Sequence, residues 1–436
     1  MIQIEPTECL MDELVSIRVS GLRPGQHITI RCETWEQKFV YDSYAQFIAS
    51  LEGEVDCTRD PSFGGCYRGV NAMGIFAHML PAVGQMKGLR YFPRRCMSAM
   101  EFQLQVYAGH LDDENKFTKN PLLKQGGDDT TGIVVSPLTE GVVFRRCNGE
   151  GVTRHEVRHG RVRGTIFQPA GAGPFKGVID VYGGAGGINE SRVAMLASRG
   201  FIAFTLPHHL HDDLPQRIED LEVEYFLEAI HYFTSLPTVQ PGGVGMLAVC
   251  GGGAVAVFLS TICPKISAFG LFGSPYTLTF RIKFNGEHVT NEMIQHIAGA
   301  RPLIKFDEHG GAYTDEWNLH VPEDRYATEI EKSDAAFLVV AGTDDKSMHA
   351  VAAGQYMVNR MRKHGKGDRI MLLTYPGAGH FIDPPYMPKT LVQYMPAHKR
   401  CSAVGGEPVA ISCASEHCWK ETINFLNKNV GLSSKI

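Results

Sequence analysis

The chain lacks the features of membrane-spanning, secreted and nucleic-acid-binding proteins. Its 436 residues carry 42 Lys and Arg against 47 Asp and Glu, and this net charge of −5 gives no electrostatic attraction for nucleic acid. No run approaches the roughly 18 apolar residues of a membrane-spanning helix. The stretch from Met1 to Pro6 has neither the basic start nor the apolar segment of a signal peptide. We therefore expect a soluble globular protein that has no nucleic-acid partner and no membrane span.

Cysteine is present, but not at the spacings of a disulfide framework. The eleven cysteines are an odd number and are scattered, which predicts reduced thiols in a reducing compartment. Cys413, Cys418, His417 and His398 lie near one another in the sequence, but their spacing matches no zinc pattern. The sequence therefore predicts no metal site, and we expect no cofactor.

The last three residues of the chain, Ser434 to Ile436, are close to the peroxisomal signal S-K-L, with isoleucine in place of leucine. A frayed polar tail that happens to end this way is the alternative. The sequence therefore leaves two locations open, peroxisomal and cytoplasmic.

Internal repeats and low-complexity segments are also absent, and 436 residues exceed what one hydrophobic core holds, which favours two domains. Residues 1–145 are predicted to be all-β, because short alternating runs are separated by turn residues such as Gly21 to Gly25. The runs are Val15 to Val19, Ile28 to Cys32 and Phe102 to Tyr107. Strands at this spacing predict an immunoglobulin-like β-sandwich.

Residues 155–436 are predicted to form an α/β domain, because apolar runs of strand length alternate with helical patterns. The predicted strands are Gly160 to Phe167, Gly177 to Tyr182, Phe201 to Leu206, Val244 to Val249, Ser267 to Phe272, Ala336 to Ala341 and Ile370 to Tyr375, and the predicted helices are Ser191 to Ser198 and Asp220 to Phe233. Continuous apolar strands between helices imply a mostly parallel sheet that is covered on both faces. The fold class is therefore α/β.

A cysteine directly follows the predicted strand that ends at Val249, and three glycines follow the cysteine. Cys250, before Gly251, Gly252 and Gly253, has the layout of a nucleophile elbow, in which a reactive side chain sits on a strained strand-to-helix turn. Small residues are needed there because the backbones of strand and helix nearly touch. The glycines favour this interpretation over that of a small buried hydrophobe, which free cysteine often is.

The partners of such a nucleophile follow it in α/β-hydrolases in the order acid, then histidine. Asp344 and Asp345 follow the predicted strand that ends at Ala341, and His380 follows the one that ends at Tyr375. Each group lies just beyond the C-terminal end of a parallel strand, where open α/β sheets bind ligands. We predict a Cys-Asp-His triad in which only one of the aspartates need act. A turn role for the aspartates and a surface position for His380 are the alternatives.

The expected roles follow from this order. His380 takes the proton of Cys250 to give a thiolate–imidazolium pair, and a carboxylate holds the other ring nitrogen. The dipole of the helix that begins at Gly251 lowers the pKa of the thiol further. The backbone N–H groups of Gly251 and of Gly184, in the run from Tyr182 to Gly187, are the predicted oxyanion donors.

Two further motifs have competing interpretations. The glycine run of residues 183–187 is similar to a dinucleotide-binding loop, but Asn189 stands where the third glycine belongs, so we reject that interpretation. The segment from His208 to Asp213 is similar to a set of metal ligands, yet nothing else supplies the residues that support a metal site. We interpret this segment as a polar loop near the mouth of the site.

The chain resembles the family of acyl-CoA thioesterases and bile acid-CoA:amino acid N-acyltransferases over nearly its whole length. The resemblance is carried by Gly69 to Ile75, Arg161 to Thr165, Gly173 to Asp180, Asp213 to Pro215, Gly379 to Tyr386 and Gly405 to Pro408. It implies a β-sandwich followed by an α/β-hydrolase domain, with Cys250 as nucleophile, Asp345 as acid and His380 as base. Ala248 departs from the usual glycine of a hydrolase elbow, and Cys250 stands where the thioesterase members have serine.

The resemblance implies an acyl-CoA substrate, and the thiol bears on the fate of the acyl group. Attack by Cys250 exchanges one thioester for another, and the acyl-cysteine is then released by water or by an amine. We expect hydrolysis, so that the protein is a fatty acyl-CoA thioesterase. The alternative is an N-acyltransferase that passes the acyl group to a glycine- or taurine-like amine, because thioesters react far more readily with amines than with water. Transfer, however, requires an acceptor pocket.

Two other functions stay open at this point. Dienelactone hydrolases also use a cysteine in a Cys-Asp-His set on a related fold, although they lack the N-terminal domain. A non-enzymatic acyl-CoA binder is the second, and it would be favoured by a Cys250 that is inert to iodoacetamide at neutral pH.

Overall fold

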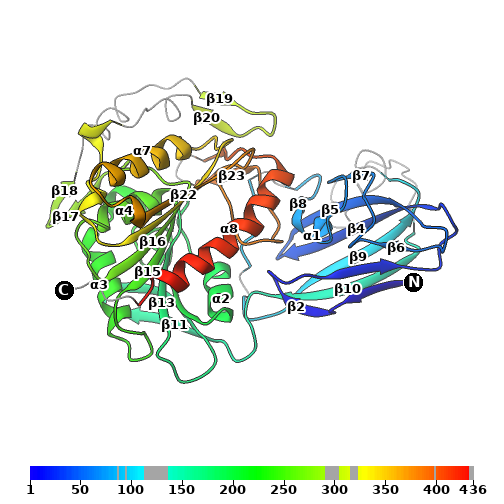
Figure 1. Cartoon of the computed structure of the whole chain (residues 1–436), viewed down its shortest axis with the longest axis horizontal. Coiled ribbons are helices and arrows are strands. Elements are labelled where there is room, and N and C mark those ends of the chain that lie inside the picture. Colours follow the sequence, from blue (N-terminus) through cyan, green and yellow to red (C-terminus); the bar gives the residue numbers. More distant parts are fainter. Residues whose placement is uncertain are drawn as a thin grey trace. The chain divides into compact units, whose positions relative to one another are not determined.

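The structure is a computed structural model, and it describes residues 1–85, 88–93, 96–111, 136–289, 304–314, 323–396 and 399–431 (Figure 1). The chain divides into two compact units. The first comprises Met1–Arg146 with Pro385–Thr390, and the second comprises Cys147–Pro384 with Leu391–Ile436. The C-terminal tripeptide that is similar to a peroxisomal signal lies outside the described residues.

All of residues 155–436 were predicted to belong to the C-terminal domain, whereas Pro385–Thr390 group with the N-terminal unit in the structure. The buried Lys389 ammonium donates a hydrogen bond to the Ala77 carbonyl. The Arg145 guanidinium donates to the Tyr386 carbonyl at 3.3 Å. These contacts join residues far apart in the sequence, so no local pattern could have indicated them.

The described part of the N-terminal unit consists of strands and one short α-helical turn. The strands are β1 (Ile2–Glu5), β2 (Glu8–Leu10), β3 (Ser16–Val19), β4 (His27–Glu36), β5 (Phe39–Ile48), β6 (Val55–Asp56), β7 (Gly64–Gly65), β8 (Leu80–Pro81), β9 (Met100–Ala108) and β10 (Thr139–Arg146), and the turn is α1 (Gly74–Ala77). They form a sheet of order β1-β3-β6 and a sheet of order β2-β10-β9-β4-β5-β7, with β8 beside β5. Residues of β9 alternate between buried and more exposed positions, as in a sheet with one face in a core.

The C-terminal unit is organised around an eight-stranded sheet of order β11-β12-β14-β13-β15-β16-β21-β22. Its strands are β11 (Thr153–His159), β12 (Val162–Gln168), β13 (Lys176–Val181), β14 (Phe201–Thr205), β15 (Val244–Val249), β16 (Ile266–Phe272), β21 (Ala336–Gly342) and β22 (Ile370–Tyr375). β12 is antiparallel to both of its neighbours, and the pairs from β14 to β22 are all parallel. This arrangement is that of an α/β-hydrolase.

Among the described residues, five α-helices accompany this sheet, and six shorter strands lie outside it. The helices are α2 (Ser191–Ser198), α3 (Val223–Ser235), α4 (Gly251–Leu259), α7 (Ala350–Lys363) and α8 (Pro408–Asn429). The shorter strands are β17 (Ile282–Phe284), β18 (Glu287–Val289), β19 (Ile304–Phe306), β20 (Ala312–Thr314), β23 (Val392–Met395) and β24 (Arg400–Ala403). In the described part of the chain, no helix is both long and apolar enough to span a bilayer.

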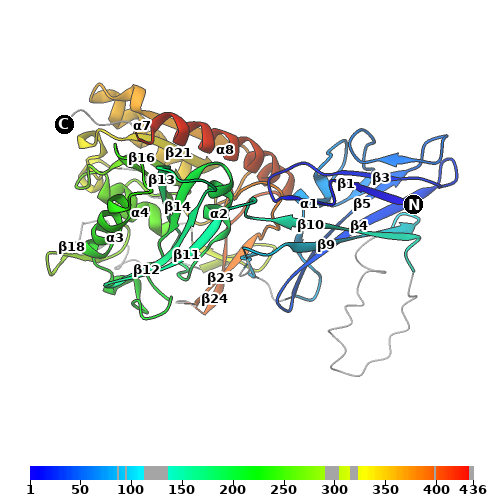
Figure 2. The ribbon, with the colours of Figure 1, turned by 90° about the horizontal axis from the view of Figure 1, so that it is seen from below.

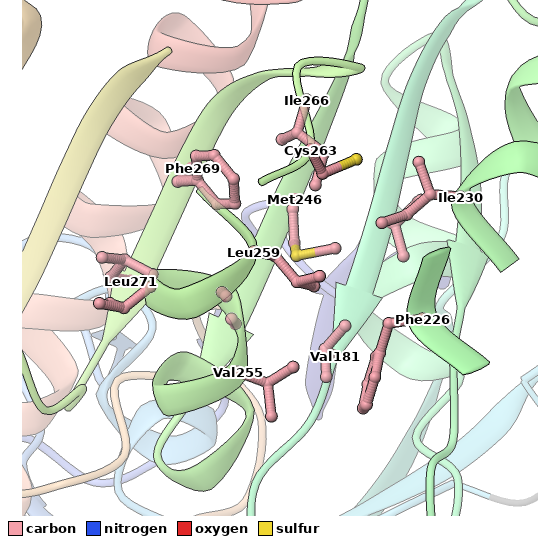
Figure 3. Close-up of a cluster of buried hydrophobic side chains, with 14 of the residues drawn as sticks. Val181, Phe226, Ile230, Met246, Val255, Leu259, Cys263, Ile266, Phe269 and Leu271 are labelled. Atoms are coloured by element: carbon pink, nitrogen blue, oxygen red, sulfur yellow. The ribbon is translucent and has the colours of Figure 1, made fainter. Parts of the chain in front are cut away.

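One face of the large sheet packs against α3, α4 and α7. Met246 of β15 belongs to a core cluster that contains buried residues of all three helices. Figure 3 shows Phe226 of α3 and Val255 of α4 among these side chains. All six residues of β15 are buried, as expected for a parallel strand covered on both faces.

Successive residues of a strand point to opposite faces of the sheet, and the residues that point away from α3, α4 and α7 face α2 and α8. Asp180 of β13 accepts hydrogen bonds from Arg192 of α2. A side chain at Gly245 of β15 would come within 2.9 Å of Leu426 of α8, and Figure 2 shows α8 running along the sheet. The C-terminal ends of the parallel strands are therefore held rigidly between two layers of helices, and the loops that follow them carry the candidate site.

Candidate active site

Cys250 occupies a strained turn between β15 and α4. Its backbone dihedral angles are φ 55° and ψ −121°, a conformation that a residue with a side chain rarely adopts and that stores strain at functional sites. The turn is held because the Cys250 N–H donates to the Phe272 carbonyl at 3.0 Å and the Cys250 carbonyl accepts from the Gly253 N–H at 2.9 Å. The predicted nucleophile elbow is therefore present in the backbone geometry.

Glycine is required after Cys250 because the turn brings α4 against neighbouring segments. A Cβ on Gly252 would lie 2.5 Å from the Val181 carbonyl oxygen, and one on Gly253 would lie 1.9 Å from the Ser274 hydroxyl. Neither position has room for a methyl group. The glycine run of the sequence is thus a packing requirement of the elbow.

Asp345 and His380 are joined at the ends of β21 and β22. The Asp345 Oδ2 atom lies 2.8 Å from His380 Nδ1, and both side chains are 2% exposed. The other carboxylate oxygen of Asp345 accepts from the backbone N–H groups of Ser347 at 2.8 Å and Met348 at 3.0 Å. The carboxylate is therefore fixed by the start of the next segment and orients the imidazole ring.

Asp344 has a different environment from its neighbour. Its Oδ2 atom accepts from the Gly406 N–H at 2.8 Å, and its Oδ1 atom lies 2.8 Å from the Lys346 ammonium. The side chain is 41% exposed. Asp344 therefore anchors a loop, and the structure brings only Asp345 to the histidine.

The His380 ring is buried and faces the cysteine. Its backbone N–H donates to the Val404 carbonyl at 2.8 Å, which fixes the loop after β22. Among the described residues, Nε2 of this ring makes no hydrogen bond, and the charge of the Cys250 thiolate acts on the ring. The structure thus brings Cys250, His380 and Asp345 together in the predicted order and excludes a surface position for the histidine.

The pKa values of the pair shift in opposite directions. Burial alone would raise the pKa of the Cys250 thiol, but the charge of His380, together with nearby backbone N–H groups, outweighs burial and lowers it. Burial alone would lower the pKa of His380, but the charges of Asp345 and Cys250 and the hydrogen bond of Asp345 raise it well above its usual range. Both shifts favour a thiolate beside an imidazolium ion.

The two glycines predicted as oxyanion donors lie beside the thiol. The backbone N–H groups of Gly184 and Gly251 both lower the pKa of the Cys250 thiol. The two residues are close to each other, since a Cβ on Gly251 would lie 3.3 Å from the Gly184 nitrogen. Both N–H groups are therefore near the place where the oxyanion of an intermediate on Cys250 would form.

The segment from His208 to Asp213 is only partly the polar loop that the sequence predicted. Asp212 and Asp213 are exposed, but His208 and His209 are each 3% exposed. His209 Nε2 lies 3.2 Å from the Gly184 carbonyl oxygen. The Phe226 ring of α3 lies 5.8 Å from the His208 ring between centroids, which the sequence could not show. Among the described residues no group of three or more His, Cys, Asp or Glu could hold a metal ion.

Other residues that support the site were missed in the sequence. Gly273 has φ +50°, and a Cβ there would lie 2.8 Å from His380 Nδ1, so the ring packs directly on this backbone. The Tyr182 hydroxyl donates to Asp383 at 3.0 Å and ties the loop after β13 to the loop of His380. The position of Gly273 directly after an apolar strand was the available signal. His398, once considered with the C-terminal cysteines, lies outside the described residues.

Comparison with known families shows matches to both units. The family model described as Acyl-CoA thioester hydrolase/BAAT N-terminal region matches residues 12–159. The model described as BAAT / Acyl-CoA thioester hydrolase C terminal matches residues 221–432. Together they span the β-rich unit and most of the unit that carries the candidate site.

Full-length relatives show the same similarity. Bile acid-CoA:amino acid N-acyltransferase of Mus musculus is 34% identical over 99% of this chain and 98% of its own length. The Homo sapiens protein of the same name is 32% identical, again over 99% and 98%. Acyl-coenzyme A thioesterase 5 of Mus musculus is 30% identical over 98% of this chain and 96% of its own length.

Proposed function

The chain belongs to the family of acyl-CoA thioester hydrolases and bile acid-CoA:amino acid N-acyltransferases, and we propose that it cleaves acyl-CoA through a covalent acyl group on Cys250. In this proposal Cys250 is the nucleophile, His380 is the acid and base, and Asp345 orients the histidine. The observation that carries it is the buried His380 ring, which bonds Asp345 on one nitrogen and faces the Cys250 thiol on the other. Membership of this family sets aside the dienelactone hydrolase and the non-enzymatic binder.

The first half of the reaction forms the acyl-enzyme. The Cys250 thiolate attacks the carbonyl carbon of the thioester, and the negative charge moves to the carbonyl oxygen. The N–H groups of Gly184 and Gly251 stabilise this oxyanion. The bond between that carbon and the sulfur of CoA then breaks, and the CoA thiolate takes the proton of the His380 imidazolium. Free CoA leaves, and the acyl group remains on Cys250 as a new thioester.

The second half releases the acyl group to water. Neutral His380 removes a proton from a water molecule as that water attacks the acyl carbon. The bond to Cys250 breaks, the thiolate returns and the histidine is again an imidazolium, so the atoms and charges of the resting site are restored. The products over the cycle are a fatty acid and CoA, and the activity is that of an acyl-CoA thioesterase.

An amine acceptor is the second candidate for this step, and the identity of the nucleophile favours it. A thioester such as acyl-Cys250 reacts far more readily with amines than with water. The relatives of 34% and 32% identity are named as amino acid N-acyltransferases. An amino acid with a free amine would replace water, His380 would take its proton, and the product would be an amide.

Product analysis distinguishes the two acceptors. The purified protein is incubated with a long-chain acyl-CoA alone, with glycine and with taurine, and CoA, free acid and amide are quantified by mass spectrometry. Free acid without amide at high amine concentration supports the thioesterase and rules out transfer. Amide that increases with amine concentration at the expense of acid supports transfer. Release of no CoA under any condition would contradict the proposed function.

We also propose that the two sheets of the N-terminal unit form an immunoglobulin-like sandwich. Ile17 of the three-stranded sheet is fully buried, as are Ile28 and Leu104 of the seven-stranded sheet. Buried apolar side chains on both sheets are what a shared core requires. A crystal structure in which the buried face of either sheet packs on something other than the second sheet would contradict this.

A further inference from the structure

The backbone N–H group of Gly184 is a proposed oxyanion donor, but a glycine residue does little by itself to fix the direction of that group. Glycine has no side chain, and a Cβ built at Gly184 would meet no atom within 4 Å. Glycine is also the residue with the greatest backbone freedom. The direction of the Gly184 N–H group must therefore be fixed by hydrogen bonds from its surroundings.

His209 provides such bonds at two points of the loop of residues 183–187. Its Nε2 atom lies 3.2 Å from the Gly184 carbonyl oxygen. Its backbone carbonyl accepts from the Gly187 N–H at 2.9 Å. Because a carbonyl oxygen only accepts, the His209 ring must carry its proton on Nε2. The loop is thus bonded to one residue on both sides of its turn.

The loop closes tightly around this histidine. A Cβ on Gly186 would lie 3.0 Å from His209 Nε2 and 2.8 Å from the Cβ of Leu210. Gly186 has φ +71°, a conformation that suits glycine. The glycines that the sequence places in this loop therefore allow its backbone to approach the imidazole ring.

Burial keeps this ring neutral. Desolvation lowers the pKa of His209, against smaller opposing effects of the Gly184 carbonyl and of Glu219. The adjacent His208 ring lies 4.7 Å away between ring centroids, and burial lowers its pKa to about 3. A neutral ring can donate to a carbonyl without adding a positive charge beside the thiolate.

We propose that His209 is a positioning residue for acyl transfer: its Nε2–H group holds the Gly184 carbonyl and so keeps the Gly184 N–H directed at Cys250. His209 acts through the Gly184 backbone. A role in acyl transfer rests on the proposed function, whereas the effect on the pKa of Cys250 does not depend on any substrate. Loss of the bond lets Gly184 turn away and removes one of the donors that stabilise the thiolate.

The test uses variants of the full-length protein and the reactivity of Cys250. His209→Met has no donor, His209→Gln keeps an amide N–H at similar reach, and His211→Ala changes a partly exposed histidine of the same loop. Alkylation of Cys250 by iodoacetamide is followed against pH by peptide mass spectrometry, with the exposed Cys413 as internal reference. Single-turnover acylation by a long-chain acyl-CoA is measured in parallel.

His209→Met is expected to move the pH midpoint of Cys250 alkylation to higher pH, so that alkylation below the midpoint is about threefold to tenfold slower. The same variant should slow acylation about 10- to 100-fold with little change in KM. His209→Gln should recover most of both effects, and His211→Ala should match the unchanged protein. A folded His209→Met protein with an unchanged midpoint would overturn the proposal. So would an equal shift in His211→Ala. If no variant of the protein is acylated but the midpoint shifts as expected, the proposed function fails and the positioning role stands.

A measurement on the unchanged protein covers the case in which His209→Met does not fold. The tautomer of His209 is read from the nitrogen chemical shifts of ¹⁵N-labelled histidine, assigned by the signal that disappears in His209→Gln. A neutral ring protonated on Nε2 between pH 6 and 8 supports the proposal. A ring protonated on Nδ1 alone, or charged in this range, would overturn it.

Discussion

Two neighbouring carboxylates show how closely function is assigned at the scale of single residues. Asp344 and Asp345 are chemically identical and adjacent, and only the second reaches His380. Asp345 is buried with the histidine, whereas Asp344 is partly exposed and bonds a backbone N–H and Lys346. The sequence predicted that one of the two would suffice, and the family resemblance selected Asp345. The geometry is consistent with that selection.

Substitution of each aspartate by asparagine should therefore have unequal effects. Asp345→Asn removes the charge that raises the pKa of His380 and favours the wrong ring tautomer, and we expect acylation to slow roughly 10³-fold. Asp344→Asn keeps an oxygen that can accept from the Gly406 N–H, so a loss below about tenfold is expected. Single-turnover acylation is the measurement. Equal losses in the two variants would contradict the assignment of the acid.

The shifted pKa of the thiol leads to a second prediction at this scale. His380 lowers the pKa of Cys250 against the effect of burial, so thiolate is present at pH values below the ordinary thiol pKa of about 8.5. In His380→Gln the opposing charge is gone and burial dominates. The pH midpoint of Cys250 alkylation should rise above the ordinary thiol value of about 8.5, whereas in the unchanged protein it should lie below that value. A midpoint that does not move in His380→Gln would contradict a thiolate–imidazolium pair.

At the scale of elements, the elbow depends on the close approach of β15, α4 and β13. A Cβ on Gly252 would lie 2.5 Å from the Val181 carbonyl, and backbone cannot move away as a flexible side chain can. Gly252→Ala should destabilise the C-terminal unit by about 1–3 kcal/mol, the usual cost of overpacking. Thermal unfolding followed by near-ultraviolet circular dichroism measures the effect.

Gly149→Ala is the matched control for this substitution. Its Cβ would lie 3.5 Å from Ser198, an ordinary van der Waals distance, so the same change of residue should leave the unfolding temperature nearly unchanged. Equal decreases for the two variants would mean that the added methyl group at Gly252 is not the cause.

The central strands of the C-terminal unit could be predicted because their sequence pattern is unambiguous. β15 and β21 are continuous apolar runs, since both faces of the sheet are covered by helices. β11 was missed because six of its seven residues are exposed and it has no apolar alternation. α7 was missed although Ala353, Met357 and Met361 form a buried stripe at helical spacing, so that signal was available.

The triad residues of the candidate site could be predicted for a topological reason. The residues that hold the triad in place could not be predicted. Parallel strands end at the same edge of a sheet, so residues that follow β15, β21 and β22 meet there. The contact of His209 with Gly184 and that of Gly273 with His380 arise from loop conformations. Such conformations depend on the packing of the whole unit and leave no periodic signal.

At the scale of the whole molecule, the buried Arg145 leads to a prediction about the stability of the N-terminal unit. Its guanidinium is fully buried, donates to the carbonyls of Met11 and Tyr386, and lies 4.7 Å from the centre of the Phe76 ring. Removing the guanidinium leaves these buried carbonyls without a donor, which costs about 1–3 kcal/mol. We expect Arg145→Met to reduce the local free energy of unfolding by about this amount, measured by hydrogen exchange of the β9 amides.

The neighbouring Arg146 is the control for this prediction. It pairs with Glu8 at the surface, where both side chains are exposed by more than a third, and such pairs contribute little. Arg146→Met should therefore leave the protection of β9 nearly unchanged. Equal protection in the Arg145→Met and Arg146→Met proteins would contradict a structural role for the buried guanidinium.

The proposed reaction requires a covalent acyl group on Cys250. The most direct measurement mixes the protein with a long-chain acyl-CoA, quenches with acid within one turnover and determines the intact mass and the modified peptide by mass spectrometry. We expect one added acyl mass on the peptide that contains Cys250, and none in Cys250→Ala, which should also release no CoA. A Cys250→Ala protein that still cleaves acyl-CoA, with no adduct on Cys250 in the unchanged protein, would contradict the proposed reaction.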